Sequence, residues 1–231
     1  MSKYAIKFSK EGYLCYISHL DLLRLFKRAF KKADIRLIHS QGYNPHPRLG
    51  FAQPLSLGYS SICEFLEVET IDHYPIYEIE TNLQKLMPTG IKILCAIELP
   101  GDLKSLAATN VEAEYLIGIP VHNGFEKDGD TLCQEFLAQD EIIEQKRQKK
   151  TKKMIDMDIK PKIRFLNFLF TDTTLIVTAQ LDAGSISNLS PELLISAIAK
   201  FLSIDTPRSD IQVMRKKLNF EKKVDNVIWK K

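Results

Sequence analysis

The sequence predicts an α+β protein: a ferredoxin-like, split β-α-β N-terminal unit followed by a second α+β unit of similar order, as a divergent duplication would produce. Alternating apolar and polar runs separated by two helical patterns give the order β-α-β-β-α-β over about the first 100 residues. Further strand and helix patterns follow the break at Pro100-Gly101. The expected organisation is a ferredoxin-like domain with the site over 1–100, a second α+β domain over 111–221 containing a basic segment 146–164, and a tail over 222–231.

The first helix has the strongest local signal. Ser18, followed three residues later by Asp21, matches the Ser/Thr-x-x-Asp/Glu capping-box pattern, which predicts a helix over 18–33. A strand over 4–8 precedes it. The rest of this half is expected as a strand over 35–40, a loop over 42–58 rich in glycine and proline, a strand over 63–70, a helix over 76–87, a strand over 91–99 and a linker over 100–110.

The second half has weaker signals. The two apolar runs 163–170 and 174–181 flank a short polar turn, which indicates a hairpin. Ser190 followed by Pro191 is a good helix start. The other expected elements are a strand over 111–121, a helix over 131–139, a strand reaching about residue 150, a helix to about residue 202 and a closing strand over 211–220.

Charge is unevenly distributed along the chain. Residues 1–50 carry ten Lys/Arg against three Asp/Glu, whereas residues 51–145 carry four against seventeen. The segments 146–164 and 215–231 are basic again, with nine against two and seven against two. Such segregation can form a positive surface that attracts polyanions, although each run can also be a simple solvated face. The acidic middle argues against a protein that coats nucleic acid with its whole surface.

Polar groups on both sides of the first helix are expected to meet. In a ferredoxin-like unit the first two strands run in the same direction and the intervening helix runs back, so the helix start and the end of the second strand share one edge. A helix N-terminus favours anions, and arginine can bind phosphate or carboxylate with two hydrogen bonds. The predicted binding residues at this place are His19, Asp21, Arg24, Gln41, Asn44, His46 and Arg48.

Simpler interpretations of the same residues stay open. Asp21 can do no more than cap the helix, and His46 can be an ordinary loop histidine. His19, His46 and Asp21 are permitted metal ligands, but nothing in their spacing requires a metal. No metal site and no catalytic residue is therefore assigned.

Two cationic groups are predicted to contact a polyanion. The first lies on one face of the helix, where cations recur at i, i+3, i+4 and i+7. The second is the run 146–153, which is either a phosphate-tracking segment or a solvated loop, and which lacks the interleaved aromatic residues of a stacking platform. The residues concerned are Lys27, Arg28 and Lys31 on the helix, beside Arg24, and Lys149, Lys150, Lys152 and Lys153 in the run.

The sequence indicates a cytoplasmic protein with no membrane association. No window reaches the roughly 18 apolar residues of a membrane helix, and no apolar run follows the first residues as in a signal peptide. The four cysteines, 48, 32 and 38 residues apart, form no Cys-x-x-Cys pair, so buried reduced thiols are expected.

Motifs spread over most of the chain form a recognisable set. They are Tyr16-Ile17-Ser18-His19-Leu20-Asp21, then Ser40-Gln41-Gly42-Tyr43-Asn44-Pro45-His46-Pro47, then Leu55-Ser56-Leu57-Gly58 with Glu64-Phe65-Leu66, and finally Lys152-Lys153-Met154-Ile155-Asp156 followed by Ile159-Lys160-Pro161. In these residues the chain resembles the radical-SAM-linked protein family, a bacterial family of unknown function. Members are found as the C-terminal part of, or encoded beside, a cobalamin-binding radical SAM protein. The resemblance implies an accessory role beside such an enzyme, in RNA or ribosome-related metabolism, and supplies no catalytic residues.

Three functional hypotheses follow. This chain has no Cys-x-x-x-Cys-x-x-Cys run, so no cofactor is expected in it, and the partner is expected to carry the iron–sulfur cluster, SAM and cobalamin. The first hypothesis is an accessory or substrate-binding protein that works with that enzyme and binds RNA or another polyanion. The second is a stand-alone enzyme that uses His19 and His46 as acid and base in RNA cleavage or hydrolysis. The third is a small-molecule or phosphate-binding regulatory module that uses Arg48.

Overall fold

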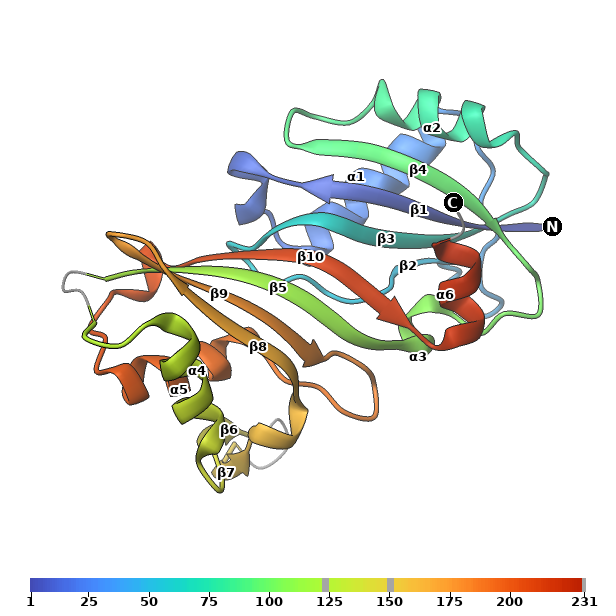
Figure 1. Cartoon of the computed structure of the whole chain (residues 1–231). Coiled ribbons are helices and arrows are strands. Elements are labelled where there is room, and N and C mark those ends of the chain that lie inside the picture. Colours follow the sequence, from blue (N-terminus) through green and yellow to red (C-terminus); the bar gives the residue numbers. More distant parts are fainter. Residues whose placement is uncertain (122–124, 149–151, 230–231) are drawn as a thin grey trace. The chain divides into compact units, whose positions relative to one another are not determined.

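The structure is a computed structural model that describes residues 1–121, 125–148 and 152–229 (Figure 1). Contacts between residues divide the chain into two compact units. The first consists of Met1–Val111 together with Lys217–Lys231, and the second of Glu112–Lys216. Both contain strands and helices, which confirms the predicted α+β class.

The first unit has the strand order of a ferredoxin-like fold. Its central strand β1 (Ser2–Lys10) pairs antiparallel with β3 (Ser60–Thr70) and with β4 (Ile91–Leu99), and the short β2 (Leu49–Phe51) pairs antiparallel with β3. The order β4-β1-β3-β2, with one helix after β1 and another after β3, confirms the predicted split β-α-β arrangement. The remaining elements of this unit are η1 (Gly12–Tyr16), α1 (His19–Lys32), α2 (Ile76–Gln84), α3 (Leu106–Thr109) and α6 (Lys222–Ile228).

Helices α1 and α2 cover one face of this sheet. Tyr4, Ile6 and Phe8 alternate along β1, so they point to the same face of the sheet, and all three are fully buried. They share an apolar core with Phe26 of α1 and Ile79 of α2. The apolar side of α1 therefore faces the sheet, and its cationic side is left exposed.

The edge strand beside β3 differs from the prediction. The expected strand over 35–40 forms only isolated bridges, from Leu37 to Thr70 and from His39 to Pro47, and regular pairing resumes at β2, inside the segment expected to be a loop. The chain thus leaves the sheet edge as a hairpin over residues 39–47, the 39–47 hairpin, and then rejoins the same edge. Burial of Phe51, whose ring contacts those of Phe8 and Phe26, explains why the strand continues after the hairpin.

The second unit repeats the same order. Strand β5 (Asn110–Pro120) pairs antiparallel with β9 (Thr174–Asp182), and β9 forms the predicted hairpin with β8 (Ile163–Phe170). The order β10-β5-β9-β8 matches that of the first unit and confirms the expectation of a similar second unit. Its other elements are α4 (Gly129–Ala138), the paired strands β6 (Ile143–Arg147) and β7 (Met154–Asp158), η2 (Lys160–Lys162), α5 (Pro191–Leu202), η3 (Arg208–Asp210) and β10 (Gln212–Phe220).

The boundaries of the two units differ from those expected. The first unit includes the segment expected as a linker, which contains α3. It also includes the C-terminal residues from Lys217 onward. The segment expected as a tail over 222–231 contains α6, in which Val224 and Ile228 are buried. The apolar residues of this segment explain why it folds onto the first unit instead of forming a free tail. The Trp229 ring packs against the ring of Phe65, with 5.8 Å between the ring centroids.

Candidate functional site

The start of α1 is occupied by its own capping interactions. The Asp21 backbone N–H donates to Ser18 Oγ at 3.1 Å, which confirms Ser18 as the N-cap, and the Ser18 hydroxyl donates to Asp21 Oδ2 at 2.7 Å. Arg24 Nη1 pairs with Asp21 Oδ1 at 2.9 Å. The hydrogen bond from Ser18, followed by that from Arg24, lowers the pKa of Asp21, so this carboxylate stabilises the fold at neutral pH and loses that effect as the pH falls through its lowered pKa. The Asp21 carboxylate is therefore engaged in stabilising the first turn of α1.

Replacing Ser18 with alanine is expected to lower the free energy of unfolding by about 1 kcal/mol, because an N–H of the first turn loses its acceptor. Urea denaturation of the two proteins measures the difference. Ser18→Thr, which keeps the hydroxyl, should stay close to the natural protein. An equal loss in both variants would show that the cap is not what stabilises this end of α1.

The loop that contains Gln41, Asn44 and His46 does not lie at the start of α1, where it was predicted. His19 lies edge-on to Phe51, with 5.1 Å between ring centroids. In contrast, His39 and Pro47, which close the 39–47 hairpin, border a cavity with Lys27 and Lys31 in the second half of α1. The loop lies at this end of α1 because the chain leaves the sheet edge at His39, before it has formed the expected strand over 35–40. The loop therefore comes before strand β2 and not after it.

The polar loop residues predicted as ligands divide between two places. Gln41, Asn44 and His46 are exposed on the 39–47 hairpin, which is closed by the Ser40 N–H to the His46 carbonyl at 2.8 Å and by the His46 N–H to Ser40 Oγ at 3.0 Å. Arg48 instead pairs with Glu69 at 2.9 Å. The predicted set of seven residues is therefore not gathered into a single pocket.

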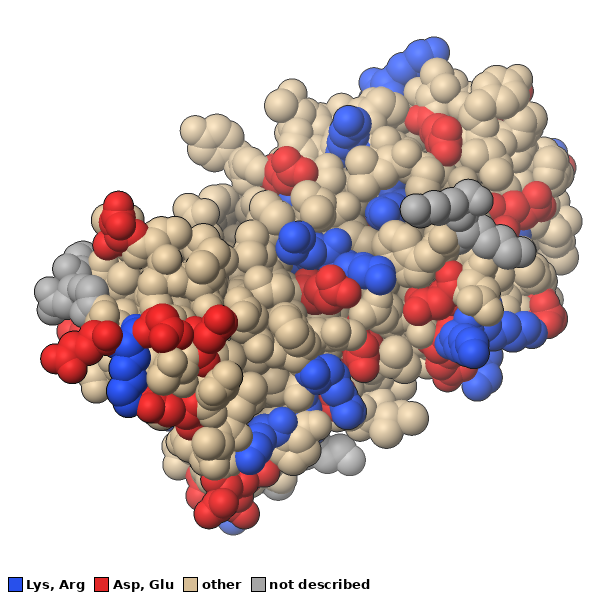
Figure 2. Space-filling view, viewed as in Figure 1, with Lys and Arg blue, Asp and Glu red and all other residues tan. Residues whose placement is uncertain are grey.

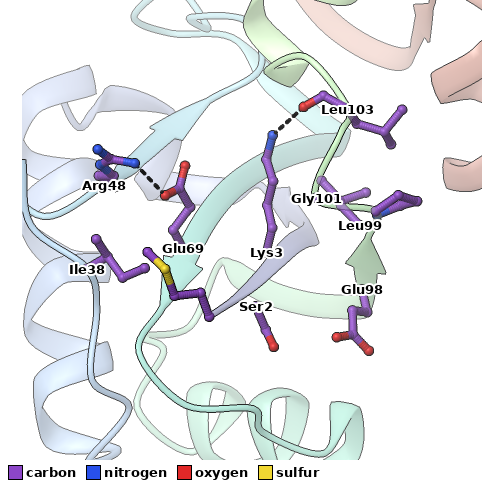
Figure 3. Close-up of a pocket in the computed structure, with 11 residues that line it drawn as sticks. Ser2, Lys3, Ile38, Arg48, Glu69, Glu98, Leu99, Gly101 and Leu103 are labelled. Carbon is purple, nitrogen blue, oxygen red and sulfur yellow. Dashed lines mark hydrogen bonds and ion pairs between the residues drawn. The ribbon is translucent and has the colours of Figure 1, made fainter.

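Arg48 faces a cavity of about 720 Å³ at the start of β1. Figure 3 shows its guanidinium directed at Glu69, with Lys3 reaching toward the carbonyl of Leu103. Glu98 also lines this cavity. Because both signs of charge are present and Lys3 is paired with Glu67, the cavity has no strong preference for an anion.

A second cavity, of about 630 Å³, is lined by three of the residues predicted to contact a polyanion. Lys27, Arg28 and Lys31 line it from α1, and His39 and Pro47 line it from the 39–47 hairpin. We call it the α1 cavity. Its remaining lining consists of Phe30, Asp34, Ile35, Arg36, Leu37 and Ile71.

The α1 cavity carries an excess of positive charge. Within the described residues Lys27 and Lys31 have no carboxylate partner, and Arg28 donates Nε–H only to the Arg24 carbonyl, at 3.3 Å. Arg36, which also lines the cavity, is neutralised by its ion pair with Asp72 at 2.6 Å. Asp34 is the acidic residue among those that line the cavity. Three cations in the described part of the chain thus remain available to a ligand, so the cavity can bind an anion.

His39 is a lining residue that the sequence did not identify. Its Nδ1 lies 3.1 Å from the Leu37 carbonyl, which can only accept, so this nitrogen carries the proton. In the neutral ring Nε2 is then a hydrogen-bond acceptor. The alternation of apolar Leu37 with polar His39 is a signal in the sequence, but it becomes informative only once the structure shows where the hairpin lies.

The basic run of the second unit is only partly described. Lys149 and Lys150 lie outside the described residues. Lys152 and Lys153 lie between β6 and β7, where the Lys152 N–H donates to the Gln148 carbonyl at 3.0 Å. Contact of this run with a polyanion stays a prediction.

Acidic side chains gather elsewhere in the second unit. Figure 2 shows Asp and Glu clustered over α4. The helix and its start carry Asp128, Asp130 and Glu135, and Asp128 accepts from the Thr131 N–H at 2.8 Å, which lowers the pKa of Asp128. The face that includes α4 is therefore unsuited to a polyanion.

The cysteines do not form a metal site. Cys15, Cys63 and Cys133 are buried and Cys95 is half-buried, all as free thiols, and burial raises the pKa of Cys15, Cys95 and Cys133. Among the residues that the structure describes, no group of three His, Cys, Asp or Glu side chains is arranged to hold a metal ion. The helices in this part of the chain are also too short or too polar to span a bilayer.

Comparisons with known proteins place the chain. A family model described as "Uncharacterized protein conserved in bacteria (DUF2344)" matches residues 3–191. No curated protein matches significantly. A chain of a Cbf5–Nop10–Gar1 complex is 10% identical with a TM-score of 0.52; the match covers 95% of this chain and 50% of that one, so this protein spans half of that chain's length. This similarity concerns the fold alone.

A further similar structure is that of an unknown protein from Galdieria sulphuraria. It is 10% identical, with 95% of this chain and 98% of that chain covered. Its TM-score of 0.27 is too low to support a structural argument.

Proposed function

We propose that this chain, which belongs to the DUF2344 family of bacterial proteins, binds RNA or another polyanion at the α1 cavity, as an accessory or substrate-binding protein of a cobalamin-binding radical SAM enzyme. The observation that carries the binding function is the set of three cations without carboxylate partners in the described residues, Lys27, Arg28 and Lys31. They project from consecutive turns of one helix, where side chains three and four residues apart are neighbours. Such a row matches the repeated charge of a phosphate backbone.

The accessory role has separate support. The motifs around Ser18 and the 39–47 hairpin resemble a family found with radical SAM proteins, and the sequence contains no Cys-x-x-x-Cys-x-x-Cys run. In this proposal the partner supplies the iron–sulfur cluster, SAM and cobalamin, and this chain supplies the substrate-binding surface. Size-exclusion chromatography of the two purified proteins tests the association, and separate elution at micromolar concentration would contradict it.

The two other hypotheses have less support. A reaction that uses His19 and His46 as a pair needs both imidazoles at one substrate, but His19 packs on Phe51 and His46 lies on the hairpin beside the second half of α1. A module that grips phosphate with Arg48 has to compete with Glu69 for its guanidinium. Neither arrangement favours the corresponding function over polyanion binding.

Binding of a fluorescein-labelled 12-nucleotide single-stranded RNA, followed by anisotropy in increasing KCl, tests the binding function. The plot of log K against log salt concentration is expected to have a slope of about −2 or steeper, because three phosphate contacts release counterions with a coefficient of about 0.7 each. The variant K27Q/R28Q/K31Q should lose about 2 from the magnitude of this slope.

The matched control is K85Q/K92Q/K104Q, which removes the same charge from three exposed lysines outside the α1 cavity. It should keep the slope of the natural protein. A slope near zero, or an equal change in both triple variants, would refute binding at this cavity.

A further inference from the structure

The α1 cavity has an apolar floor, which phosphate binding does not require. Phe30, Ile35 and Leu37 line it and are almost fully buried, with 1%, 4% and 8% of their surface exposed. Pro47 and the half-exposed Ile71 add apolar surface at its border. A ligand that uses the whole cavity therefore has a flat or apolar part as well as negative charge.

An exposed aromatic residue stands on the hairpin whose ends border this cavity. Tyr43 lies near the tip of the 39–47 hairpin, and its side chain is fully exposed, at 108% of the reference surface. Gly42 before it has a φ of +131°, a conformation that turns the chain at the tip and that side chains rarely adopt. Three residues separate Tyr43 from Pro47, so the Cα of Tyr43 lies within about 14 Å of the Cα of Pro47 at the cavity border. A few nucleotides of one extended strand can span this interval.

Resting on the proposed function, we infer that the α1 cavity receives one unstacked nucleobase of single-stranded RNA. The cations Lys27, Arg28 and Lys31 contact the phosphates on either side of it. The base lies on Phe30 and Leu37, and His39 Nε2 accepts a hydrogen bond from an amino group on its edge. Tyr43 stacks on a neighbouring base, as aromatic side chains do in single-strand binding sites.

The geometry distinguishes a single strand from a duplex. In a duplex each base is paired and stacked, so a base reaches the cavity only if it is first unpaired and flipped out of the stack, which disfavours the duplex. The cationic row alone contacts either kind of strand. Base-dependent, strand-selective binding is therefore the property that the apolar floor and Tyr43 add to the phosphate contacts.

Three probes of equal length in the same salt test the inference by anisotropy: the single-stranded 12-mer, the duplex of the same sequence, and a 12-mer with all bases removed. The 12-mer with bases should bind at least about 10-fold more tightly than the baseless strand, which has the same phosphates. Equal, salt-dependent affinity for these two strands would overturn the inference and leave the proposed function intact. Absence of salt-dependent binding to any probe would overturn both.

A tyrosine variant tests the stacking contact independently. Tyr43→Ala should weaken binding of the single strand about 5- to 150-fold and leave the baseless strand unaffected, because one stacked base is lost. Tyr43→Phe should restore the affinity. The control is Tyr77→Ala, which removes another exposed tyrosine, on α2, outside the cavity. Loss of affinity in Tyr77→Ala equal to that in Tyr43→Ala would overturn the role of Tyr43.

Discussion

Replacing Phe26 with alanine is expected to lower the free energy of unfolding by about 3–5 kcal/mol, because the substitution leaves a cavity where α1 meets β1 and β2. Phe26 is fully buried, and its ring centroid lies 4.9 Å from that of Phe8 and 6.0 Å from that of Phe51. A domain is stabilised by only about 5–15 kcal/mol in total, so this loss is a large fraction of it. Denaturation in guanidinium chloride measures the change.

Leu20→Ala is the matched control for this prediction. Leu20 lies on the same helix but is 60% exposed, so its truncation should change the stability by no more than about 0.5 kcal/mol. A loss below about 1 kcal/mol for Phe26→Ala would show that α1 is not held to the sheet by this aromatic cluster. The cationic row would then lack the fixed position that we ascribe to it.

Replacing Gly129 with alanine is expected to lower the free energy of unfolding of the second unit by about 3 kcal/mol, the upper end of the usual cost of overpacking. Gly129 begins α4 and is buried, and a Cβ placed on it would lie 2.8 Å from the carbonyl carbon of Phe168 and in hard contact with the carbonyl oxygen. Because these atoms belong to the backbone of β8, they cannot move aside as a flexible side chain does. Helix α4 therefore has to shift.

Gly118→Ala is the control in the same unit, since its Cβ would lie at an ordinary 3.8 Å from Thr174 Cγ2. Hydrogen exchange of the β8 amides, compared with those of β1, should show the loss of protection from Gly129→Ala confined to the second unit. Unchanged exchange in β8 would contradict the close approach of α4 to this strand.

Local signals predict the helices of this fold well. Ser18 predicts the start of α1 because capping is an interaction between residues three apart, and the structure contains it. Ser190 likewise caps α5, with Pro191 as its first residue. Such contacts are short-range, so the sequence contains all that decides them.

The edge strand was harder to predict because its position depends on distant residues. The run 35–40 has strand character, but only Leu37 bridges β3 before the chain leaves the sheet at His39. Phe51, the last residue of the short strand β2, packs into the core against Phe8 and Phe26. No local pattern around Phe51 indicates this contact.

The same distinction applies to the candidate site. The spacing of Lys27, Arg28 and Lys31 predicts a shared face of α1, and the structure places all three at one cavity. The sequence does not predict the other side of the cavity, because the topology it indicates places residues 39–47 at the opposite end of the helix. The sequence does not predict Tyr43 as a site residue for the same reason: only the path of the chain shows that its hairpin borders the α1 cavity.

Because residues from Lys217 onward belong to the first unit, that unit cannot be completed until the second unit has been synthesised. Residues 112–216 are synthesised before α6, so the first unit still lacks Val224, Ile228 and Trp229 when the last residue of the second unit has been added. Until then the Phe65 ring has neither Phe220 nor Trp229 against it. The nascent first unit therefore keeps the Phe65 side of its sheet uncovered until residues 217–229 are made, although most of this unit is synthesised first.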